Sequence, residues 1–335
     1  MSEKQRKSWL LWIGWSVAAV ALIIGLAIDE GKADNLLSRA TVALIIGLAP
    51  LIGAQLALGS PAVLSTVTTW LRSTQRPLRH TAGGITALYL ITGLLVGRFD
   101  PYALVIVGVG VFAALGALRQ TAPGQAGLTW MDVSIWMLLW IPFDLRWNYD
   151  LWFGPDGFAY NWWAVAISVT AVIGWASFRG LPDFGYRLTP RWRDMGIAVL
   201  FTVIFAAIVI PIGLAIDFLS WPPSSTPAVS AVVAHAVGLF LTVAIPEELF
   251  FRGILLHGLD QMMKRRWLAL LVSSLAFGLM HWNNASDLTT QIAYVALATL
   301  AGVFYGVTYR RSGNNLLAAV TMHTLVDLIW RFMLQ

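Results

Sequence analysis

The sequence predicts an all-α fold, a polytopic transmembrane helical bundle. Of its 335 residues, 58% are hydrophobic and only 12% are charged, whereas a soluble domain carries about 25% charged residues. Apolar stretches recur along the chain and are long enough to cross a bilayer, which takes about 20 helical residues. The chain has no cysteine, which excludes disulfides and thiolate metal sites. Its net charge of +5 does not indicate nucleic acid, because the basic residues lie between the apolar stretches.

About eleven apolar stretches are candidate spans. The first begins at Trp9 and is too long and too poorly ended for a cleaved signal peptide, so we interpret it as a signal anchor. The others follow as apolar runs between polar or basic segments, and the third, fourth, fifth and ninth are short. The expected spans are 9–28, 40–59, 81–97, 102–118, 128–143, 160–178, 195–217, 229–256, 267–281, 290–309 and 316–334.

The basic residues between the spans predict the orientation, because cytoplasmic loops carry an excess of Lys and Arg. The basic segments are the N-terminus (Lys4, Arg6, Lys7), the loop with Arg72, Arg76 and Arg79, the loop 179–194, Lys264–Arg266 and Arg310–Arg311. With eleven spans they all fall on one side, and the opposite loops, such as Asp144–Tyr160 and Ser220–Pro227, hold few cations. We therefore expect a multi-pass protein of the cell membrane with its N-terminus in the cytoplasm.

The basic loop 179–194 also divides the chain. The spans before it carry few ionisable residues, and every polar cluster of interest follows it. We therefore expect an N-terminal transmembrane region of unknown role, 1–180, and a functional core, 181–335.

The functional core contains three charges close together in an apolar span. Glu247 and Glu248 follow the apolar run Ala231–Pro246, and Arg252 comes four residues after Glu248. Each such charge costs about 2.5–3.5 kcal/mol in a membrane helix, so it is expected to pair, line a wet cavity or do chemistry. Positions i and i+4 share a helix face, which predicts a Glu248–Arg252 ion pair. Glu247 is rotated by about 100° from Glu248 and is the candidate general base. The proline before it favours a kink or a fresh helix start.

Two histidines are predicted to lie near Glu247. Counted from the basic turn at Arg265, Glu247 lies 18 residues back and His281 lies 16 residues forward. In an antiparallel helical hairpin the two side chains are level to within about one turn, ~3–5 Å, with Phe277 one turn before His281. In the last span, His323 and Asp327 are i and i+4. The carboxylate can accept from one imidazole nitrogen and leave the other for water or substrate.

These residues form three ordered motifs. They are Glu247-Glu248-Leu-Phe-Phe-Arg252, Phe277-Gly-Leu-Met-His281 and His323-Thr-Leu-Val-Asp327. The series resembles the EExxxR, FxxxH and Hxxx(N/D) motifs of the CAAX-processing and bacteriocin-processing family of intramembrane proteases, the family of type II CAAX prenyl endopeptidases. Phe184-Gly-Tyr-Arg187 resembles the lead-in to the family's first span. The resemblance covers about 150 of the 335 residues, and residues 1–180 show none.

The resemblance implies an intramembrane endopeptidase acting on a membrane-embedded or lipid-modified polypeptide. It assigns the activation of water to Glu247, and it completes the catalytic set with His281, His323 and Asp327. Glu248, Arg252 and Phe277 support the site. Known family members carry asparagine where this chain has Asp327, and an ionised aspartate cannot donate to an oxyanion. We therefore expect Asp327 to orient His323.

Two alternatives remain at this stage. Glu247, His281 and His323, with Asp327 as a fourth ligand, could bind Zn²⁺ with one open position, although the resemblance favours a mechanism without a cofactor. The same polar residues could also serve a non-proteolytic protein, either an immunity or scaffold protein or a proton-coupled carrier, because chains of Glu, His and Asp also form proton relays.

Overall fold

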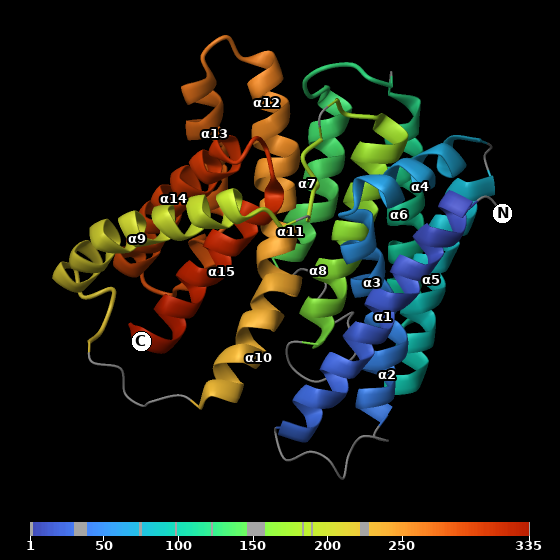
Figure 1. Ribbon diagram of the computed structural model, residues 1–335, viewed down its shortest axis with the longest axis horizontal. Helices are drawn as coiled ribbons and strands as arrows, with labels where there is room; N and C mark the ends of the chain where they lie inside the picture. Colours follow the sequence, from blue (N-terminus) through green and yellow to red (C-terminus); the bar gives the residue numbers. More distant parts are fainter. Residues whose placement is uncertain are drawn as a thin grey trace. The chain divides into compact units, whose positions relative to one another are not determined.

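A computed structural model of the chain shows helices and no strand among the residues it describes (Figure 1). The described residues are 3–29, 39–73, 76–97, 99–121, 123–145, 158–182, 184–188, 190–221 and 228–334. Most of the expected loop Asp144–Tyr160 and of the expected loop Ser220–Pro227 lies outside these ranges. The chain forms two compact units, Met1–Phe184 and Gly185–Gln335. The boundary between them in the sequence falls within the basic loop 179–194.

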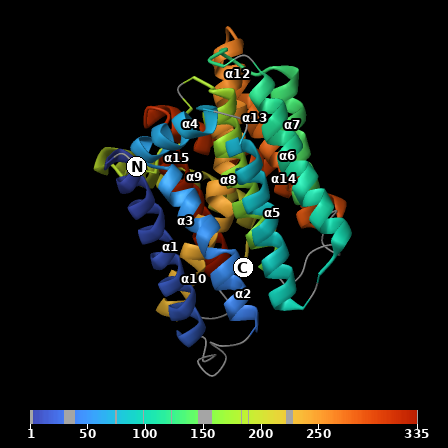
Figure 2. The ribbon, with the colours of Figure 1, turned by 90° about the vertical axis from the view of Figure 1, so that its right-hand side faces the viewer.

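The first unit consists of helices joined by short connections. Their bounds are α1 (Glu3–Asp29), α2 (Arg39–Gly47), α3 (Ala49–Leu58), α4 (Pro61–Ser73), α5 (Arg76–Val96), α6 (Pro101–Gln120), α7 (Trp130–Asp144), α8 (Phe158–Ala171) and the π-helical η3 (Val172–Arg179). Helix α5 packs beside α6, and α6 beside α7 (Figure 2). A buried ion pair between Arg179 and Asp132, with Nε and Oδ2 3.2 Å apart, ties the end of η3 to the start of α7.

One expectation about this unit is wrong. The sequence places Arg72, Arg76 and Arg79 in a loop, whereas Arg72 lies in the last turn of α4 and the other two in the first turn of α5. Helix α4 is too short and too polar to stand out as an apolar run. It follows the end of the second expected span at a bend of 105°.

The second unit consists of a small set of long helical segments. They are α9 (Trp192–Ala215), the continuous run Val229–Met262, α13 (Arg266–Leu279), α14 (Leu288–Arg311) and α15 (Leu316–Met333), with a 3₁₀ turn η6 (Trp282–Asn284) before α14. Helix α14 packs against α13 and α15, and α9 packs against α14 and α15. These helices cover the last five expected spans.

Among the described residues, five helical segments are long and apolar enough to cross a membrane, or six if the bent pair around Gly59 counts as one span. The five are Pro101–Gln120, Asn161–Arg179, Trp192–Ala215, Val229–Met262 and Leu288–Arg311. The protein is therefore an integral membrane protein built from helices. The span count of about eleven stays a prediction, because the remaining helices are shorter or more polar.

Helices α13 and α14 approach each other closely at glycines, as small residues permit in membrane proteins. A Cβ atom added to Gly278 would lie 2.6 Å from the carbonyl oxygen of Val295 and would also overlap the Thr299 hydroxyl. A backbone atom cannot move aside as a side chain can, so the two helices would have to separate.

We expect Gly278→Ala to lower the free energy of unfolding by about 1–3 kcal/mol, the usual cost of overpacking. Gly196→Ala is the matched control, because a Cβ atom at Gly196 in α9 meets nothing within 4 Å and alanine is favoured over glycine within a helix. Thermal unfolding followed by circular dichroism in one detergent measures both. Equal melting temperatures for the two variants would contradict the close approach.

Candidate active site

The two adjacent glutamates lie in the middle of the run Val229–Met262, drawn in orange in Figure 1. The run consists of α10 (Val229–Leu239), π-helical η4 (Phe240–Ala244), α11 (Ile245–Glu248), π-helical η5 (Leu249–Leu256) and α12 (His257–Met262). The sequence favours a kink or a fresh helix start at Pro246, but the helix continues through it. Wide π turns on both sides accommodate the residue that cannot donate an N–H. Such π segments are frequent at functional sites.

The predicted ion pair between Glu248 and Arg252 is present. Arg252 Nη1 donates to Glu248 Oε1 at 2.9 Å, and the side chains are 1% and 0% exposed. The same guanidinium donates through Nη2 to the carbonyl oxygen of Gly302, at 3.1 Å. It also lies over the rings of Phe277 and Tyr305, 4.3 and 5.1 Å from their centroids. Arg252 therefore joins the helix that carries the glutamates to α13 and α14.

Glu248 also holds His323. The Nδ1 atom of His323 lies 2.8 Å from Glu248 Oε1, the oxygen that accepts from Arg252. Since a carboxylate accepts, Nδ1 carries the hydrogen. The ring of Tyr305 stacks on the imidazole at 4.6 Å and 14°, and the ring of Phe277 meets it edge-on at 5.8 Å. His323 is thus fixed on one nitrogen and two sides.

The free edge of His323 faces two carboxylates. Its Nε2 atom lies 3.7 Å from Glu247 Oε2 and 3.5 Å from Asp327 Oδ2. Asp327 therefore lies where it can orient His323, as expected, and Glu248 adds a shorter contact at the other ring nitrogen. Asp327, with 25% of its side chain exposed, lies beside the nitrogen that remains available. The Glu247 side chain is 13% exposed, in contrast to the fully buried Glu248.

His281 joins the same cluster through Phe277. It follows the end of α13, where its Nδ1 lies 2.9 Å from the carbonyl oxygen of Phe277. Because a carbonyl only accepts, Nδ1 is the protonated nitrogen, and Nε2 is an acceptor in the neutral ring. The ring lies 4.7 Å from that of Phe277 and stacks on Tyr294 at 5.4 Å. Phe277 therefore touches both histidines. The helix-hairpin prediction agrees with this packing, in which Ser273 also donates to the carbonyl oxygen of Phe251 at 2.8 Å.

The lead-in segment positions the helix that carries His323. The backbone N–H groups of Leu316 and Leu317 donate to the carbonyl oxygens of Gly185 and Arg187. The buried side chain of Asn315, which caps α15, donates to Asp194 at 2.7 Å. The segment that resembles the family's lead-in thus anchors the N-terminus of α15.

Two aromatic residues of the site, Tyr294 and Tyr305, carry no motif in the sequence. Both lie in the apolar span of α14. A tyrosine in an apolar span is expected to have a partner for its hydroxyl group. This expectation could have drawn attention to both residues, but it does not predict that their rings stack on imidazoles.

The Zn²⁺ alternative names Glu247, His281, His323 and Asp327 as ligands. Among the described residues, no three His, Cys, Asp or Glu side chains are grouped so as to hold a metal ion. The Nδ1 atoms of both histidines are already directed to Glu248 and to a backbone carbonyl. The Nε2 atoms of the two rings are directed elsewhere than these partners, so the Zn²⁺ alternative stays a prediction.

The family comparison covers this site completely. Residues 228–329 match the family model described as type II CAAX prenyl endopeptidase Rce1-like. The matched region extends from the start of α10 into α15 and includes every candidate residue from Glu247 to Asp327. No curated protein and no solved structure matches the chain. The polar cluster of the second unit thus lies within the region that matches the model of the Rce1-like type II CAAX prenyl endopeptidases.

Proposed function

We propose that this chain is an intramembrane endopeptidase in which Glu247 activates the attacking water. The observation that carries the proposal is the unequal placement of the two glutamates. Glu248 is buried and bonded to both Arg252 and His323, whereas Glu247 is partly exposed and faces the available nitrogen of His323. Of the two glutamates, Glu247 is the one that can meet a water molecule and also interact with His323 Nε2.

The chemistry follows from these placements. Glu247 takes a proton from water, and the hydroxide oxygen forms a bond to the scissile carbonyl carbon. When the C–N bond breaks, the leaving amine takes the proton from Glu247. His281 assists, because its Nε2 is an acceptor that can orient the water.

His323 is proposed as the oxyanion donor. Its Nδ1 atom is hydrogen-bonded to Glu248. When Nε2 also carries a proton, this nitrogen is a donor that faces Glu247 and Asp327. A preorganised donor of this kind contributes about 3–4 kcal/mol to stabilisation of the transition state. Asp327 favours the protonated Nε2 by its negative charge.

The proposed substrate is a membrane-associated, lipid-modified polypeptide, a proposal that rests on the family match. We further propose that the site is oriented with the N-terminus of the chain in the cytoplasm. The two basic turns of the second unit, Lys264–Arg266 and Arg310–Arg311, lie at the same end of it. Asp260 joins them, because it pairs with Arg310 and, at 3.4 Å, with Arg266. The positive-inside rule places such a basic cluster in the cytoplasm.

The experiment is cleavage of a prenylated CAAX peptide by the purified full-length chain in liposomes. We expect release of the last three residues, and slower release from the same peptide with an unmodified cysteine, because the lipid brings the peptide to the membrane. Mass spectrometry of the products identifies the cleaved bond. No cleavage of either peptide by folded protein would contradict the proposal. Equal rates for both would contradict the lipid-modified substrate.

A further inference from the structure

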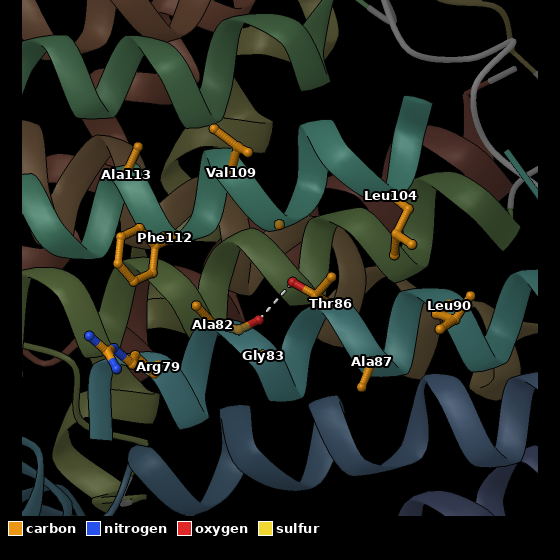
Figure 3. Close-up of a pocket in the computed structure, with 11 residues that line it drawn as sticks. Arg79, Ala82, Gly83, Thr86, Ala87, Leu90, Leu104, Val109, Phe112 and Ala113 are labelled. Atoms are coloured by element: carbon orange, nitrogen blue, oxygen red, sulfur yellow. Dashed lines mark hydrogen bonds between the residues drawn. The ribbon is translucent and has the colours of Figure 1, made fainter. Parts of the chain in front are cut away.

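A groove runs along the first unit, between the antiparallel helices α5 and α6 (Figure 3). Its volume of about 590 Å³ falls within the range of small-molecule sites, roughly 300–1,000 Å³. Small residues of α5, among them Ala82, Gly83 and Ala87, form one wall, and Val109 and Phe112 of α6 form part of the other. The groove is apolar along nearly its whole length.

The polar side chains of the groove wall are Thr86 and, at one end, Arg79. The hydroxyl of Thr86 donates to the carbonyl oxygen of Ala82 at 2.7 Å, as the dashed line in Figure 3 shows. Arg79 lies at one end of the groove beside Phe112, and Leu90 and Leu104 lie at the other end. A ligand of this groove therefore needs a long apolar body and a single polar head.

Arg79 is available to bind that head. Its side chain is exposed, and no hydrogen bond or ion pair joins it to another residue in the described part of the chain. Arg72 of the preceding helix, by contrast, donates to the carbonyl oxygen of Ser177. Arg79 also lies in the first turn of α5, at the positive end of the helix dipole. A guanidinium binds a phosphate through paired hydrogen bonds.

The length of the groove matches one leaflet of a bilayer. From Arg79 to Leu90 the helical rise is about 16 Å, close to half of a hydrocarbon core that is about 30 Å thick. Helix α6, which forms one wall, is itself long and apolar enough to span the membrane. The groove is therefore long enough to hold an acyl chain that starts beside the arginine.

We propose that the α5–α6 groove binds one anionic phospholipid, with an acyl chain between the helices and the phosphate on Arg79. The basic residues at this end predict the cytoplasmic leaflet, where anionic lipids are concentrated. This site belongs to the first unit and does not depend on the proposed protease activity.

Two variants test the two parts of the site. A Cβ atom at Gly83 meets nothing within 4 Å, so Gly83→Leu fills the groove without disturbing the helices. Gly84→Leu is its matched control, because Gly84 is equally open but does not line the groove. Arg79→Gln removes the cation. Its control is Arg193→Gln, which removes an exposed arginine from the second unit.

The measurement is native mass spectrometry of the full-length chain titrated with phosphatidylglycerol and with phosphatidylcholine of identical acyl chains. We expect one tightly bound phosphatidylglycerol, favoured about fivefold over phosphatidylcholine, the preference expected for one cation. Arg79→Gln should abolish the preference, Gly83→Leu should weaken binding of both lipids, and both controls should behave as the wild type. Glycerol phosphate, which has the charge without the chain, should not displace the lipid.

Wild-type binding in Gly83→Leu and Arg79→Gln would overturn the proposal, as would an equal loss in Gly84→Leu. Displacement of the lipid by glycerol phosphate would show that the charge of the headgroup alone determines binding. It would overturn the proposal that the groove holds an acyl chain. Circular dichroism and gel filtration establish that each variant is folded before it is titrated.

Discussion

Replacing Glu247 by glutamine is expected to reduce the rate of peptide-bond hydrolysis by about 10²–10⁴-fold, the contribution of a positioned general base. Glutamine has nearly the same size and can still donate and accept hydrogen bonds, but its amide cannot take a proton from water. Because the Glu247 side chain is partly exposed and does not belong to the Glu248–Arg252 pair, folding should be nearly unchanged. The rate is measured in liposomes with the prenylated peptide, and folding is measured by thermal unfolding.

The matched control for this substitution is Asp287→Asn, which makes the same change from carboxylate to amide outside the cluster. Asp287 caps α14 by accepting from the backbone N–H of Thr290, and asparagine caps helices equally well. We expect wild-type activity in this variant. Full activity in both Glu247→Gln and Asp287→Asn would show that Glu247 is not the general base.

Much of the site could be predicted from sequence because its main elements are local. The Glu248–Arg252 pair follows from positions i and i+4 of one helix. The contact between the glutamate-bearing helix and α13 follows from a hairpin with a short basic turn. Both inferences require only the helical repeat and the membrane as context.

The bond between Glu248 and His323 could not be predicted in this way. The two residues are 75 positions apart, and their contact depends on how α15 packs against the helix that carries the glutamates. Asp327, four residues away, could be predicted as a partner of His323, and it does lie beside Nε2, whereas the partner of Nδ1 comes from a distant helix. The stacking of Tyr305 on His323 has the same origin, since it arises from α14 and α15 lying side by side.

The fold shows a similar limit. Long apolar runs identified helices throughout the second unit, whereas α4 was missed because a short, amphipathic helix has no long apolar run. The π turns around Pro246 were also missed, since proline signals a break but does not show whether neighbouring turns widen to avoid one.

Replacing Glu248 by leucine is expected to destabilise the protein by about 3–5 kcal/mol, because it leaves the buried charge of Arg252 without its carboxylate. The same change removes the acceptor that holds His323 Nδ1. This single variant therefore cannot separate a loss of activity from a loss of folding.

A second substitution separates the two effects. In Glu248→Leu/Arg252→Met both buried charges are replaced by apolar side chains of similar size, an exchange that is often neutral or stabilising. We expect the double variant to recover most of the thermal stability lost in Glu248→Leu. Hydrolysis should nevertheless stay low, since His323 still lacks its bond to a carboxylate and can rotate away from Glu247.

Thermal unfolding in detergent and hydrolysis of the prenylated peptide in liposomes, measured on the same preparations, give the comparison. Recovery of stability without recovery of activity is the result expected if Glu248 both neutralises Arg252 and orients His323. Recovery of both would show that the bond from Glu248 to His323 is dispensable for catalysis. Recovery of neither would show that Arg252 stabilises the fold mainly through Gly302 and the rings of Phe277 and Tyr305, contacts that methionine cannot reproduce.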